Sequence, residues 1–86
     1  MPKISFFYGI IIKMYFDDHN PPHFHAEYAE FNAKIGINDF ALQEGSLPSK
    51  AMALVVEWAI IHQKELLENW NLMLEKKSLN SIEPLR

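Results

Sequence analysis

The chain has 86 residues, of which 49% are hydrophobic and 22% are charged, a composition typical of a globular domain and not of a disordered chain. It contains no cysteine, which excludes disulfides, cysteine-based zinc fingers and thiol nucleophiles. The net charge of −3 argues against nucleic-acid binding through bulk charge. We therefore expect one domain over residues 1–86 that does not bind nucleic acid by itself.

Residues 3–43 show the period-two alternation of short β-strands. Gly9 interrupts the first of these segments and is interpreted as a bend or bulge, not as a full turn. The segment 17–22 is a strong break, because it holds two prolines together with Asp and Asn residues that favour turns. In the following strand, alternation places His23 and His25 on one face and Phe24 on the other.

Residues 48–76 predict one long α-helix. Pro48 suits the first helical turn, and no glycine or proline follows until after residue 77. A straight helix of this length would extend roughly 40 Å, so it either overhangs the sheet or breaks near Asn69. Its apolar stripe is wider than one buried face requires, which suggests a partner chain. The fold class is therefore α+β: an antiparallel meander of three to five strands, over about residues 3–43, packed against this helix.

Several motifs together resemble a small bacterial family of unknown function. The most specific is the run from Asp18 to Ala26, D-H-N-P-P-H-F-H-A, and the similarity continues in E-G-S-L-P at 44–48 and I-E-P-L at 82–85. The resemblance implies a toxin–antitoxin-like gene pair and a role in transcriptional regulation, without assigning catalytic residues. It leaves open whether this chain would be the toxin or the antitoxin.

The histidine-rich segment is the candidate functional site. Three imidazoles and a carboxylate within reach of one another can hold zinc or another divalent transition metal; the candidate ligands are Asp18, His19, His23 and His25. Imidazoles also titrate near neutral pH, so the same three histidines are candidates for acid–base catalysis in a hydrolase or ribonuclease. The alternative is that they only form hydrogen bonds to backbone carbonyls at a proline-rich turn.

The remaining expectations concern location and partners. His62 lies on the apolar helix stripe and is expected to be a buried, hydrogen-bonded core residue. No segment approaches the ~20 apolar residues of a membrane span, and no signal peptide is recognisable, so a cytoplasmic protein is expected. The partner is expected to be a cognate small protein or a second copy, bound through the long helix and the C-terminal tail. Whether the protein is an enzyme stays open.

Overall fold

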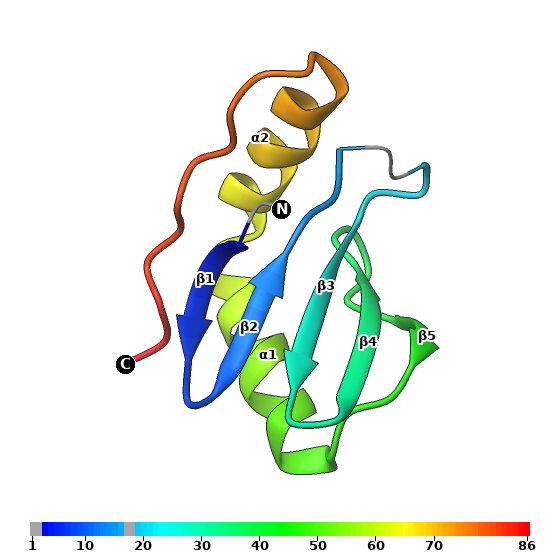
Figure 1. Ribbon diagram of the computed structural model, residues 1–86, viewed down its shortest axis with the longest axis vertical. Coiled ribbons are helices and arrows are strands. Elements are labelled where there is room, and N and C mark those ends of the chain that lie inside the picture. The colour runs from blue at the N-terminus through cyan, green and yellow to red at the C-terminus, as the bar shows by residue number, and fades with distance from the viewer. Residues whose placement is uncertain (1–2, 17–18) are drawn as a thin grey trace.

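The computed structural model describes residues 3–16 and 19–86 and contains a five-stranded sheet and two helices (Figure 1). In chain order the elements are β1 (Lys3–Phe7), β2 (Ile10–Lys13), β3 (His23–Tyr28), β4 (Phe31–Gly36), β5 (Leu42–Gly45), α1 (Ser49–Ile61) and α2 (Gln63–Leu74). The sheet is antiparallel throughout, in the order β1-β2-β3-β4-β5. The α+β class and the antiparallel meander are confirmed, with five strands at the upper end of the expected range.

The prediction of one long helix is wrong, because the helix breaks at His62. This residue has φ −111° and ψ 21°, outside the helical range, and it separates α1 from α2. The His62 imidazole bonds to the Glu65 carboxylate in the first turn of α2, and the Gln63 side chain donates to the Ile37 carbonyl at 2.9 Å. A straight helix of roughly 40 Å would also exceed the 34 Å longest dimension of the molecule.

The connection between β1 and β2 is a full two-residue turn and not the expected bend. Tyr8 and Gly9 have φ values of 50° and 79°, and Phe7 pairs directly with Ile10 across the turn. Positive φ at both central residues is the type I′ pattern that matches the twist of antiparallel strands. A tyrosine at the first of these positions gives a weaker sequence signal than asparagine or glycine would.

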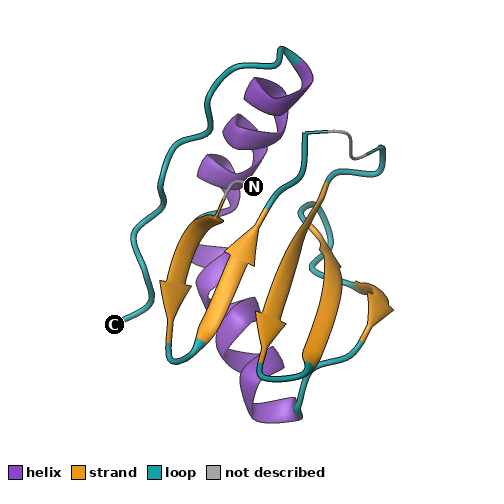
Figure 2. Cartoon of the chain, in the orientation of Figure 1, coloured by secondary structure: helices purple, strands orange, loops and turns teal. Residues whose placement is uncertain are grey.

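Both helices cover one face of the sheet, and the other face carries neither helix (Figure 2). The core lies between the helices and the inner face, where alternate strand residues such as Ile12, Phe24 and Ile35 are fully buried. From the helices, Trp58 and Trp70 fill the core, and the Trp58 ring contacts Phe24 with centroids 5.9 Å apart. Within residues 3–16 and 19–86, no helix has the length and apolar character needed to cross a bilayer.

Candidate functional site: histidines of strand β3 and the outer face of the sheet

The predicted site residues fall at the start of β3 and in the loop before it. His23 and His25 lie on β3, whereas His19 is exposed in the preceding loop. Asp18 lies outside the described residues. The Asn20–Pro21 peptide bond is cis, and it carries the chain into β3. The structure therefore brings two of the four predicted residues together on one strand.

His23 is buried, and its ring is fixed by contacts on two sides. Its Nδ1 lies 2.9 Å from the carbonyl oxygen of Pro21, so this nitrogen carries the proton and donates. The ring also packs against Trp70 of α2, with centroids 5.3 Å apart. This geometry agrees with the expectation that a histidine at this turn bonds to a backbone carbonyl. Histidines that ligate metals are often oriented by a hydrogen bond of this kind from the other ring nitrogen.

His25 is half-buried and is the third ring in a row of four, after Trp70 and His23 and before Tyr15. The His23 and His25 rings meet edge to face with centroids 5.1 Å apart, and Tyr15 meets the other side of His25 at 4.6 Å. With Trp70 this row runs from the sheet to α2. Edge-to-face packing limits rotation of the His25 ring, because movement would disturb the aromatic neighbour on each side.

Two lysines flank His25 on the adjacent strands. The register pairs Lys13 of β2 and Lys34 of β4 directly with His25. Lys13 forms an ion pair with Glu27 at 3.0 Å, and Lys34 forms one with Glu44 of β5 at 3.5 Å. Each ammonium group beside the imidazole already has a carboxylate partner, so a phosphate would bind the two lysines only by displacing Glu27 and Glu44.

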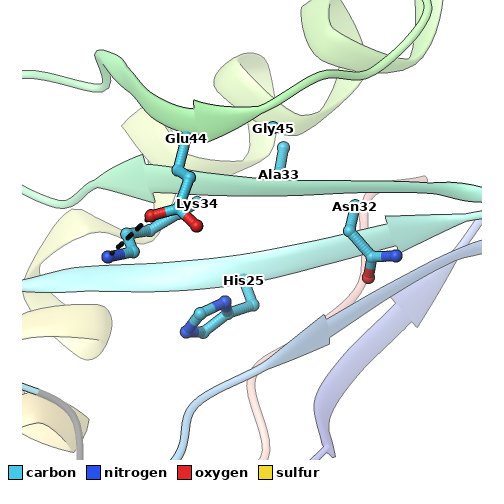
Figure 3. Close-up of a pocket in the computed structure, with 6 residues that line it drawn as sticks. All are labelled: His25, Asn32, Ala33, Lys34, Glu44 and Gly45. Carbon is cyan, nitrogen blue, oxygen red and sulfur yellow. Dashed lines mark ion pairs between the residues drawn. The ribbon is translucent and has the colours of Figure 1, made fainter.

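A shallow hollow lies beside His25 on this side of the sheet. Figure 3 shows the side chains of Lys34 and Glu44 reaching toward each other from neighbouring strands, with His25 on the next strand. The hollow is lined by His25, Asn32, Ala33, Lys34, Glu44 and Gly45. Sequence reasoning missed Asn32, Lys34 and Glu44, because only the β3–β4–β5 register places them next to His25. Alternation in residues 31–37 was the available signal, since it puts Lys34 opposite in face to the apolar Ala33 and Ile35.

The metal-binding hypothesis has a partial geometric basis. Among residues 3–16 and 19–86, no group of three or more His, Asp or Glu side chains is arranged to hold a metal ion. The two imidazoles at 5.1 Å are the part of the predicted ligand set that the structure brings together. Since Asp18 lies outside the described residues, the four-residue zinc site stays a prediction.

His62 occupies the helix break and not the site. Its imidazole is mostly buried, packs at a tilt against Trp58 with centroids 5.5 Å apart and bonds to Glu65. From these contacts we infer that His62 shapes the junction of α1 and α2.

A family model described as a domain of unknown function (DUF4160) matches residues 9–71 of the chain. That range covers the strands from the first turn through β5, the histidine-rich segment and most of both helices. No curated protein and no solved structure gives a significant match.

Proposed function

The chain belongs to the DUF4160 family of unknown function, and we propose that it is a protein-binding, regulatory member of a toxin–antitoxin-like pair. The observation that carries this proposal is an apolar surface on the outer side of α1. Ile60 and Ile61, at the end of α1, are 58% and 62% exposed, and Ala53, about two turns earlier, is also exposed. Adjacent exposed isoleucines on one helix are typical of a surface that a partner covers.

Charged residues frame this apolar surface on both sides. Glu57 lies one turn before Ile61 on α1, and Lys64 lies just past the break at His62, at the start of α2; both side chains are exposed. The partner that fits is therefore an amphipathic helix with an apolar stripe and one charge of each sign at its margins. Because the charges are mixed, they set the orientation of the partner more than they add affinity.

Co-expression with the protein encoded by the neighbouring gene tests this proposal directly. The pair should co-elute in gel filtration at micromolar concentration, and Ile60→Lys with Ile61→Lys should separate the two proteins. Leu74→Lys is a matched control, since Leu74 is 56% exposed but lies at the end of α2. Separate elution of the wild-type proteins, or equal loss of binding in the control, would contradict the proposal.

A second candidate function is RNA cleavage by His25, which is favoured by its position between Lys13 and Lys34. In that reaction an imidazole removes the 2′-hydroxyl proton while the oxygen attacks phosphorus. An acid, for which His19 is the candidate, then returns a proton to the departing 5′ oxygen. Lys13 and Lys34 would hold the phosphate, and His23 would position the His25 ring without touching the substrate.

Expression in a growing culture tests this second function. Wild-type protein should arrest growth and deplete RNA, whereas His25→Ala should do neither, with the two proteins present at equal levels. Lys50→Ala, an exposed position at the start of α1, should behave like wild type. Growth that is unaffected by wild-type protein would eliminate this function, while leaving the result of the co-elution experiment intact.

A metal-dependent version of that hydrolase would use Asp18, His19, His23 and His25 as ligands. Elemental mass spectrometry on protein purified without a histidine tag tests it. About one equivalent of zinc or another divalent metal, lost in His23→Ala, is the expected result. A metal content near zero in the wild type would remove the metal from the hypothesis and leave only the metal-free route.

A further inference from the structure

The C-terminal segment, residues 78–86, lies along the outer edge of β1 and runs in the same direction as that strand (Figure 1). The Ile82 N–H donates to the Ile4 carbonyl at 2.8 Å, and the Ser5 hydroxyl donates to the Ile82 carbonyl at 3.0 Å. Ile82 is buried, while most of the other side chains of the segment are exposed. The segment thus attaches to the rest of the protein through its backbone, through the buried Ile82, and through Leu79 and Leu85, which are partly buried against the core.

Side chains of α1 and α2 also bind the backbone of the segment. The Trp58 indole N–H donates to the Glu83 carbonyl at 2.8 Å. The Asn69 amide donates to the Asn80 carbonyl and accepts from the Asn80 N–H, both at 2.9 Å, and Asn69 is fully buried. Such backbone contacts are the means by which peptide-binding grooves recognise extended segments. The space that the segment occupies between β1, Trp58 and Asn69 is called the groove below, and these contacts fix the register of the segment in it.

The connection between α2 and this segment has the features of a hinge. After Leu74 the chain reverses through Lys76, which has φ +58°, and the Lys77 N–H bonds back to the Leu72 carbonyl. Glycine is the usual residue at this left-handed position after a helix, and a lysine there is strained. Residues 75–77 contain neither glycine nor proline, so α2 can continue through them once the C-terminal segment leaves its own groove.

We propose that this groove is an exchangeable peptide-binding site and that a second copy of the chain supplies the occupant. In the resulting dimer, each copy extends α2 through Lys76 and places its residues 78–86 in the groove of the other copy. The second copy is the favoured occupant because it carries the segment whose backbone and Ile82 already match the groove. The exchange retains those contacts and relieves the strained lysine in each copy. This inference does not depend on the α1 surface proposed above.

Light scattering coupled to gel filtration, with the 86-residue chain at about 10 µM to 1 mM, tests the exchange. Wild type should show a concentration-dependent dimer. Lys76→Gly should shift the equilibrium toward monomer by roughly five- to tenfold per hinge, because it removes the strain from the closed form. Deletion of Lys76 and Lys77 should give a dimer at the lowest concentration, since the shortened connection cannot return to its own groove.

Two further variants separate this mode of association from others. Ile82→Asp should abolish the dimer, and Ile60→Lys with Ile61→Lys should leave it unchanged, with circular dichroism confirming that each variant is folded. A monomer at every concentration in both wild type and the hinge deletion would overturn the proposal. So would a dimer that is lost in the α1 variant and kept in Ile82→Asp. If wild type stays monomeric but binds a labelled peptide of residues 78–86, the occupant is a segment of a different protein and the second-copy assignment is wrong.

Discussion

The two faces of the sheet differ in what they contribute to the protein. The inner face is apolar and closed by α1 and α2, and its central residues are fully buried. The outer face near His25 carries lysines, glutamates and an imidazole, and its ion pairs are partly solvated. Successive residues of a single strand serve these two faces, because side chains alternate along β3. Stability is therefore concentrated on one face, and the other face is free to vary its chemistry without unfolding the domain.

The largest difference between the faces is expected for neighbouring residues of β3. Phe24→Ala removes a fully buried ring that contacts Trp58, and it should lower the free energy of unfolding by about 3–5 kcal/mol. His25→Ala, one residue further on, should lower it by less than about 1 kcal/mol. Urea unfolding followed by tryptophan fluorescence measures both values. Equal losses at the two positions would show that the outer face is covered and that the comparison is wrong.

Gly45→Ala, where β5 pairs with β4, tests whether the outer hollow depends on close backbone packing. A Cβ at Gly45 would lie 2.1 Å from the Asn32 carbonyl oxygen, and Gly45 has φ +78°. Gly45→Ala should therefore cost about 1 kcal/mol for the left-handed backbone and a further 1–3 kcal/mol for overpacking, roughly.

Gly9→Ala is the matched control for Gly45→Ala. Gly9 has a similar φ of +79°, but a Cβ there meets only the Tyr28 ring at 3.4 Å. In the same urea experiment, Gly9→Ala should lower the free energy of unfolding only by the cost of the left-handed backbone, about 1 kcal/mol. If the two substitutions lower the free energy of unfolding equally, β5 moves aside without penalty and the hollow has no fixed shape.

The strands and the candidate site show how far the sequence alone can lead. Period-two alternation and the proline-rich break located the strands up to β4, because these signals are local, whereas β5 (Leu42–Gly45) extends beyond residue 43, where the strands were expected to end. The helix break was not predictable from Gly or Pro, since it arises where His62 bonds to Glu65 and Gln63 reaches the Ile37 carbonyl. That last contact joins residues far apart in the sequence, which no helical periodicity can reveal.

The candidate site was also predictable only where the signal is local. Spacing by two residues correctly indicated that the rings of His23 and His25 would be close. Their different environments depend on tertiary packing, because Trp70 covers His23 and the sheet register sets Lys13 and Lys34 beside His25. Candidate residues within one segment can thus be found from the sequence, whereas their neighbours on other strands require the register.

His23 lies at the boundary between the two faces, and its substitution should have an intermediate effect. His23→Ala removes the ring from Trp70 and leaves the Pro21 carbonyl without its donor. The free energy of unfolding should fall by about 1–3 kcal/mol. His23→Asn keeps an amide donor near the position of Nδ1 and should recover part of this loss. If both variants are as stable as wild type, the bond to Pro21 does not help to hold the start of β3.

The smallest effect is expected for the ion pair between Lys34 and Glu44 on the outer face. Its N–O distance is 3.5 Å, and the two side chains are 31% and 76% exposed, so a double-mutant cycle with alanine should give a coupling of about 0.2–1 kcal/mol. Raising the salt concentration to 1 M should reduce this coupling, because the screening length falls to about 3 Å. A coupling well above 1 kcal/mol that persists in salt would show that the pair is desolvated and supports the fold. A small, salt-sensitive coupling has a functional consequence, because any loss of ligand binding or activity in Lys34→Ala can then be assigned to the lost ammonium group and not to unfolding.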